Sequence, residues 1–168
     1  MASDGIGLTA AGDGLKGLFL AMTETTDWDR RFLALAAQVA TWSKDPSTKA
    51  GAVIVDSERR IVSTGFNGFS RGIEDAPELL NDRAKKYRMI LHAELNAILF
   101  AQRDLIGCTI YVHPMPPCAQ CAAAIIQSGI EKVVTITPSA AHQKRWWSDW
   151  MIALQMYQQA GIAFLLLE

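Results

Sequence analysis

The alternation of hydrophobic and polar residues predicts a helix and then a β-hairpin in the first half of the chain. Apolar residues recur every three to four positions over 27–43, which is typical of an amphipathic helix that Asp27 or Asp29 could cap. An apolar run at 51–55, a polar turn and a second apolar stretch from Ile61 are typical of two antiparallel strands. The sequence therefore predicts that a helix precedes an antiparallel pair of strands.

Residues 69–90 follow the second predicted strand and form a charged segment. We expect this segment to be a loop with a possible short helix. Beyond it the pattern predicts helices over 92–104, 118–129 and 146–161, and strands over 108–114, 132–137 and 162–167. Strands separated by helices favour parallel pairing through right-handed crossovers. The sequence therefore predicts a single-domain α/β fold, with a mixed five-stranded sheet covered by helices on both faces.

Composition and charge narrow the class of protein. The chain has 168 residues, of which 50% are hydrophobic and 20% charged, and its formal net charge is −1. This balance suits one globular domain and does not favour nucleic acid or an anionic membrane surface as a partner. No apolar run is long enough to span a membrane, and residues 1–21 lack the basic start of a signal peptide. We expect a flexible extension over 1–26, a domain over 27–168 and a cytoplasmic location.

The stretch "PMPPCAQC" places Cys118 and Cys121 one turn apart at the start of a predicted helix. Such a pair can be a redox motif, half of a zinc site, or two small core residues, and the pair alone leaves these alternatives open. Three cysteines cannot form a fully paired disulfide framework. The third, Cys108, begins a strand and is expected to be a buried core residue.

His92 opens the preceding helix in the sequence "HAE". One imidazole and two thiolates leave the fourth position of a tetrahedral zinc open, as in catalytic rather than structural sites. Glu94 follows two residues later, close enough to exchange protons with a water molecule without binding the metal. H-x-E followed by P-C-x-x-C is typical of the zinc-dependent nucleobase deaminases. The plainer interpretation is a capping histidine, a first-turn acid and two core cysteines.

Three further stretches carry a family resemblance: "SKDPSTKAGAVIV" (43–55), "TGFNGFSRGIED" (64–75) and "HAELNAIL" (92–99). With these and the zinc motif, the chain after residue 26 resembles the cytidine and deoxycytidylate deaminase superfamily, and within it the deoxycytidylate deaminase branch. The resemblance implies one catalytic Zn²⁺ per subunit, and it assigns roles to six residues. Its metal ligands would be His92, Cys118 and Cys121, its catalytic residue Glu94, and its substrate-binding residues Asn67 and Ala93.

The implied activity is hydrolytic deamination of dCMP to dUMP and ammonia. The alternatives are a deaminase of a free cytosine nucleoside or base, a deaminase of adenosine in transfer RNA, and a zinc protein without catalysis. The resemblance also implies a homo-oligomer. It leaves open a deoxynucleoside triphosphate effector, because Phe66 stands where regulated members have Tyr or Trp.

Several side chains keep two interpretations. Asn67 could contact the sugar, or it could be a turn residue with positive φ beside Gly68. Trp146, Trp147 and Trp150 could pack in the core or at a subunit interface, or they could cover a base. The candidates for binding a substrate phosphate are Lys44, Ser47, Thr48, Lys49, Arg88 and Arg145.

Overall fold

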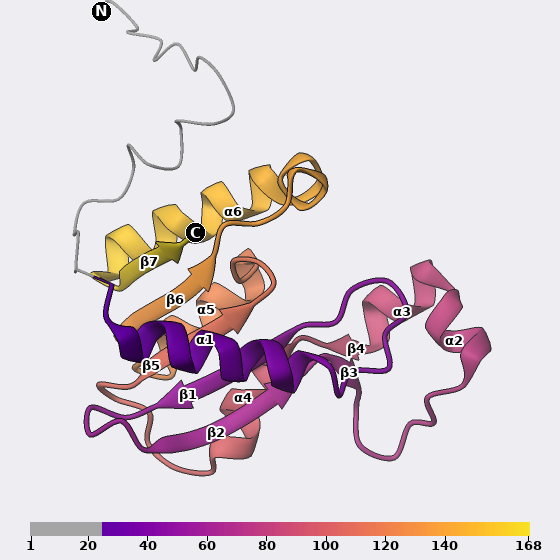
Figure 1. Cartoon of the computed structure of the whole chain (residues 1–168). Coiled ribbons are helices and arrows are strands. Elements are labelled where there is room, and N and C mark those ends of the chain that lie inside the picture. Colours follow the sequence, from indigo (N-terminus) through magenta and orange to yellow (C-terminus); the bar gives the residue numbers. More distant parts are fainter. Residues whose placement is uncertain (1–24) are drawn as a thin grey trace, which may run out of the picture.

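The computed structural model describes residues 25–168, which form a mixed five-stranded sheet in the order β2-β1-β5-β6-β7 (Figure 1). Its strands are β1 (Gly51–Val55), β2 (Ile61–Phe66), β5 (Thr109–His113), β6 (Lys132–Ile136) and β7 (Ala163–Leu167). β1 runs antiparallel to both β2 and β5, whereas β5, β6 and β7 are parallel. The predicted hairpin and the predicted parallel half of the sheet are both confirmed.

Helices cover both faces of the sheet, as predicted (Figure 1). They are α1 (Asp27–Ala40), α4 (Ala93–Ala101), α5 (Ala119–Gln127) and α6 (Ala140–Ala160). Side chains alternate along a strand, so Val53 and Val55 pack with α1 while Ala52 and Ile54 pack in the core with α4, α5 and α6. Cys108 is 2% exposed in that second core, as expected. No helix within residues 25–168 is long and apolar enough to cross a membrane.

The segment over 69–90 is more ordered than predicted. It contains two short helices, α2 (Pro77–Asn81) and α3 (Arg83–Met89), and its ends form the strand pair β3 (Gly68–Phe69) and β4 (Ile90–Leu91). α2 has only five residues, and the one buried residue of α3 is the charged Lys86, so neither helix shows an apolar periodicity in the sequence. This explains why the sequence pattern suggested a loop. The strand pair positions His92, because β4 ends at Leu91, the residue immediately before it.

Two helix starts also differ from the sequence expectation. Thr26, rather than Asp27 or Asp29, caps α1, and Asp29 completes a capping box by accepting a hydrogen bond from the Thr26 N–H at 2.9 Å. α6 begins at Ala140 instead of 146, because Ser139 accepts a hydrogen bond from the His142 N–H. The predicted flexible extension falls almost wholly outside the described residues.

Gly65 on β2 allows α4 to lie directly against the sheet. A Cβ atom at this position would lie 2.3 Å from both the carbonyl oxygen of Ala93 and the backbone nitrogen of Ala97. We expect Gly65→Ala to displace the first turn of α4 and to lower the free energy of unfolding by about 1–3 kcal/mol or more, as overpacking does. Urea unfolding measures this change. Gly68→Ala is the control, because the nearest atom to its Cβ is 3.9 Å away; equal losses in both variants would contradict the expectation.

Candidate active site

Three side chains that could hold a metal ion meet beside the ends of two helices. His92 is the N-cap of α4, Cys118 is the N-cap of α5, and Cys121 lies in the first turn of α5. The Nδ1 atom of His92 is 3.4 Å from the Sγ atom of each cysteine. All three ligand atoms lie within 4.8 Å of one another.

This spacing fits zinc. Zn–S bonds of about 2.3 Å and Zn–N bonds of about 2.05 Å in a tetrahedron place sulfur and nitrogen about 3.5 Å apart. The observed separations of 3.4 Å require almost no rearrangement to accept the ion. The donor set is also suitable, since two thiolates and an imidazole are ligands that zinc prefers. His92, Cys118 and Cys121 could therefore hold a zinc ion with one position left for another molecule.

The three side chains perturb each other's protonation. Hydrogen bonds from Cys121 and then from His92 lower the pKa of Cys118 to about 4, against the effect of burial. The hydrogen bond with Cys118 raises the pKa of His92 to about 9, with contributions from the charges of Glu94 and Asp149. Hydrogen bonding to Cys118 and burial raise the pKa of Cys121. A metal needs thiolates and neutral imidazole, so binding here displaces protons from His92 and Cys121.

Glu94 lies in the first turn of α4, two residues after His92, and is 5% exposed. Burial raises the pKa of its carboxyl group, although the nearby His92 acts in the opposite direction. A carboxyl group whose pKa moves toward neutrality is suited to taking up and releasing a proton. Glu94 and His92 line the same pocket, so the Glu94 carboxyl group is accessible to a ligand there.

That pocket brings together the loop before β1, α3, and the starts of α4, α5 and α6. It is lined by Asp45, Ser47, Thr48, Asn67, Lys86, Tyr87, Ile90, His92, Glu94, Met115, Pro116, Cys118, Arg145, Trp146 and Trp150. Trp150 is 2% exposed and closes one wall, while the half-buried Trp146 lines the pocket one turn earlier on α6. Trp147 packs instead against the core, as one of the two interpretations expected. That Trp146 and Trp150 cover a base stays a prediction.

Arg145 lies between two aromatic rings on the pocket wall. Its guanidinium carbon is 5.3 Å from the centre of the Tyr87 ring and 5.0 Å from that of Trp146. Partial burial and the charge of Arg83 lower the pKa of Arg145, and within residues 25–168 no carboxylate forms an ion pair with it. This cation therefore remains available to an anionic ligand.

The other phosphate candidates separate into two groups. Ser47 and Thr48 line the pocket together with Arg145. Lys44 instead forms an exposed ion pair with Asp75 at 2.9 Å, and Lys49 and Arg88 are not among the residues that line the pocket. The sequence alone could not separate these groups, because the packing of the loop before β1, of α3 and of α6 decides which of the six side chains line the pocket.

Asn67 is buried and bonded to the loop before β1. Its Oδ1 atom accepts a hydrogen bond from the Ala50 N–H at 2.7 Å, and its Nδ2 atom donates to the Thr48 carbonyl at 2.9 Å. Among the described non-glycine residues only Arg59 and Gln102 have positive φ, so the interpretation of Asn67 as a positive-φ turn residue is wrong. Its contact with a sugar stays a prediction, which its place in the pocket lining supports.

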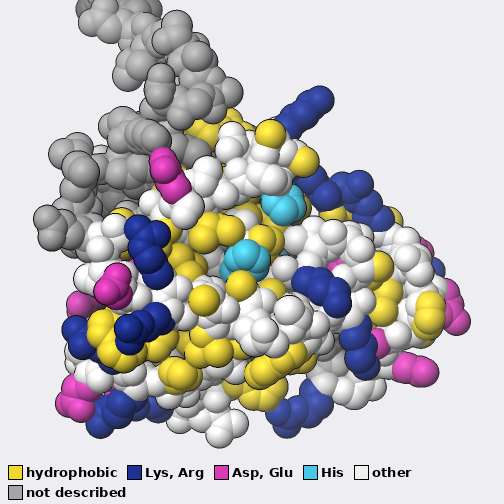
Figure 2. Space-filling view, viewed as in Figure 1, with side chains coloured by type: hydrophobic (Ala, Val, Ile, Leu, Met, Phe, Trp, Pro, Cys, Tyr) yellow, Lys and Arg dark blue, Asp and Glu magenta, His cyan; other side chains and the backbone are white. Residues whose placement is uncertain are grey.

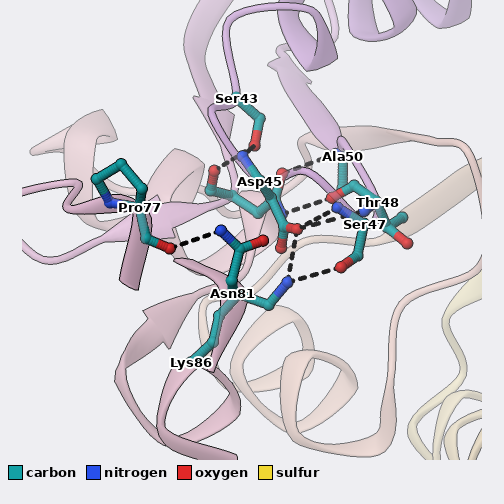
Figure 3. Close-up of polar contacts among 9 residues, drawn as sticks. Ser43, Asp45, Ser47, Thr48, Ala50, Pro77, Asn81 and Lys86 are labelled. Carbon is teal, nitrogen blue, oxygen red and sulfur yellow. Dashed lines mark hydrogen bonds and ion pairs between the residues drawn. The ribbon is translucent and has the colours of Figure 1, made fainter. Parts of the chain in front are cut away.

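Lys86 and Asp45 form a buried ion pair in the pocket wall that the sequence analysis missed. The Nζ atom of Lys86 lies 2.8 Å from Asp45 Oδ1 and 2.9 Å from Ser47 Oγ. Figure 3 shows Lys86 reaching both residues of the loop before β1. Asp45 Oδ1 also accepts a hydrogen bond from the Ser47 N–H at 2.7 Å. This network fixes the loop that carries Ser47 and Thr48, because both charges are almost wholly removed from water.

Charge on the surface does not suggest a polynucleotide site. On the face shown in Figure 2, lysine and arginine side chains are spread among acidic and hydrophobic ones instead of forming one patch. A groove for a nucleic-acid backbone would need a continuous cationic stripe. This distribution agrees with the formal net charge of −1.

Comparison with known proteins gives a consistent result. Residues 26–137 match the family model of the cytidine and deoxycytidylate deaminase zinc-binding region. An uncharacterized deaminase in the luxG 3′ region of Aliivibrio fischeri is 47% identical over 135 residues, covering 80% of this chain and 90% of that protein. The deoxycytidylate deaminase of Homo sapiens is 37% identical over 147 residues, covering 82% and 78% of the two chains. The dCMP deaminase of cyanophage S-TIM5, solved with dCMP and dUMP, shares the fold, with a TM-score of 0.65 and 19% identity over 86% of this chain and 99% of that chain.

Proposed function

The chain belongs to the cytidine and deoxycytidylate deaminase family, and we propose on this basis that it is a zinc-dependent hydrolase that converts dCMP and water to dUMP and ammonia. One observation carries the chemistry: a metal-binding triangle of His92, Cys118 and Cys121 with the buried carboxyl group of Glu94 beside it. The substrate is supported by the identity with human deoxycytidylate deaminase.

Glu94 is the proton carrier in this proposal. Zinc bound by His92, Cys118 and Cys121 would supply Lewis-acid activation of a water molecule, which lowers the pKa of that water toward neutrality. The Glu94 carboxylate takes a proton from the attacking water and passes it to N3 of cytosine. It then takes the remaining proton and passes it to the 4-amino group, which leaves as ammonia. One carboxyl group suffices because it alternates between its two protonation states.

Ala93 and Asn67 bind the substrate in this proposal. Ala93 is wholly buried at the first position of α4, so its backbone lies between the metal ligand His92 and the catalytic Glu94. A pyrimidine whose C4 faces the metal can therefore hydrogen-bond that backbone. Asn67 Oδ1 accepts one hydrogen bond from Ala50, which leaves a lone pair for a sugar hydroxyl.

In this proposal the 5′-phosphate is bound by Ser47, Thr48 and Arg145. The two hydroxyl side chains lie on the loop that the Lys86–Asp45 pair fixes, and Arg145 faces the same pocket from α6. A planar guanidinium held between two rings is preorganised for bidentate contact with a phosphate. The pocket can thus distinguish a nucleotide from a nucleoside.

We expect Arg145→Ala to lower kcat/KM for dCMP by about 10–150-fold, the effect of losing one hydrogen bond to a charged group of 1.5–3 kcal/mol. The kcat/KM for deoxycytidine should not change, since that substrate has no phosphate to contact. Ultraviolet loss of the cytosine chromophore measures both rates. Lys144→Ala, at the exposed neighbouring position, is the control. If kcat/KM fell equally for dCMP and deoxycytidine, Arg145 would not bind the phosphate.

The substrate itself is tested by comparing dCMP, CMP, deoxycytidine, cytidine, cytosine and an adenosine-containing tRNA stem-loop on zinc-loaded protein. We expect strong preference for dCMP. Equal or better turnover of an unphosphorylated compound would support the alternative of a nucleoside or base deaminase. Turnover of the stem-loop that falls steeply with salt would support the RNA alternative instead.

We also propose the organisation of the protein that the resemblance implied. Residues 27–168 are the deaminase domain and 1–26 an extension, in a cytoplasmic homo-oligomer that could respond to a deoxynucleoside triphosphate. Exposed apolar side chains next to the C-terminal end of α4 support association, since Leu99, Phe100 and Ile106 are 63%, 55% and 71% exposed. Phe66, at the position expected to contact an effector, is 38% exposed.

A further inference from the structure

The first turn of α5, which carries both cysteine ligands, is held from two sides. Inside the turn, the Cys121 N–H donates to the Sγ atom of Cys118 at 3.5 Å. Outside it, the Ala119 N–H donates to Oδ2 of Asp149 on α6 at 2.9 Å. The N–H groups of a first turn have no partner within their own helix, so these two bonds decide how the turn is oriented.

The carboxylate of Asp149 accepts this hydrogen bond without the competition of an ion pair from residues 25–168. It is half-buried, and within the described part of the chain it forms no ion pair with a lysine, arginine or histidine. Its neighbours on α6, Trp146 and Trp150, line the same pocket as His92 and Cys118. The Asp149 carboxylate therefore links the helix that walls the pocket to the backbone next to a metal ligand, instead of lying as a solvated charge.

We propose that Asp149 is a positioning residue for the metal centre. Its hydrogen bond from Ala119 fixes the first turn of α5 against α6, so that the sulfur atoms of Cys118 and Cys121 both face Nδ1 of His92. Groups that orient metal ligands from behind usually change metal affinity by about 10–100-fold when they are removed. The role concerns how tightly the metal is held, and it does not depend on which substrate the enzyme accepts.

The test removes each half of the hydrogen bond separately. Asp149→Leu removes the acceptor but keeps the number and branching of the side-chain heavy atoms, whereas Asp149→Asn keeps an oxygen that can accept. Ala119→Pro removes the donor, and it suits this position because proline is favoured at the first residue of a helix and Cys118 before it is extended. Zinc affinity is measured by competition with a chromophoric chelator, and the ligand geometry by the absorption spectrum of the Co²⁺-substituted protein.

We expect Asp149→Leu and Ala119→Pro each to weaken zinc binding by about 10–100-fold and to alter the cobalt spectrum. Asp149→Asn should lose less, and the double variant Ala119→Pro/Asp149→Leu should bind no more weakly than either single one, because both remove the same bond. Ser148→Ala, at an exposed position next to Asp149, should behave as the unaltered protein.

Unchanged zinc affinity and an unchanged cobalt spectrum in Ala119→Pro would overturn the proposal, even if thermal stability fell. Independent, multiplicative losses in the double variant would overturn it as well. If Asp149→Leu does not fold, Ala119→Pro decides alone.

Discussion

Glu94→Gln is expected to reduce deamination of dCMP by about 10²–10⁴-fold, the usual contribution of a positioned acid–base group. Glutamine has nearly the shape of glutamate but cannot take a proton from water or return one to N3 and the leaving amine. The metal ligands are untouched, so zinc should remain bound. Initial rates from ultraviolet absorbance, together with zinc content per protein chain, measure the two effects separately.

Glu78→Gln is the matched control, since Glu78 lies exposed on α2 and is not among the residues that line the pocket. It should retain full turnover. If Glu94→Gln also retained full turnover, another group would have to carry the protons. If neither the unaltered protein nor the control deaminated any cytosine compound, the interpretation of a zinc protein without catalysis would gain.

The cluster of three side chains that could hold a metal ion could be predicted from sequence, because the positions of these residues depend on local structure. His92, Cys118 and Cys121 each occupy the start of a helix, and helix starts are marked by short patterns of neighbouring residues. Glu94 follows from the same local spacing. The strand order then brings the two helix starts together. β2 and β5 both run antiparallel to β1, so they point in the same direction, and α4 and α5 begin beyond their C-terminal ends at one edge of the sheet.

The residues that support these ligands could not be predicted in the same way. Lys86 and Asp45 are 41 residues apart, and Ala119 and Asp149 are 30 apart. Each residue alone looks like an ordinary surface charge or helix alanine, and only the packing of α3 on the loop and of α6 on α5 gives it a partner. The same limit applies to the phosphate candidates, since only the folded chain shows that Ser47, Thr48 and Arg145 line the pocket.

Cys121→Ser is expected to abolish stoichiometric zinc binding and to lower dCMP turnover to the uncatalysed background. A serine hydroxyl is a hard, protonated oxygen, and it cannot replace a thiolate in a site whose ligand set otherwise consists of one imidazole and one thiolate. The observed 3.4 Å spacing from His92 Nδ1 places the Cys121 sulfur directly in that set. Zinc content and turnover after dialysis against excess zinc measure the expected loss.

Cys108→Ser provides the matched control for the cost of burying a hydroxyl group. Cys108 is 2% exposed and Cys121 is fully buried, so each substitution should destabilise the fold by about 1–3 kcal/mol through an unsatisfied hydroxyl. Only Cys121 belongs to the cluster that could hold a metal ion. Cys108→Ser should therefore keep its zinc and its turnover at a temperature where both variants are folded. Loss of zinc in both variants would show that lower stability causes the loss. Retention of zinc in both variants would show that Cys121 is not a metal ligand.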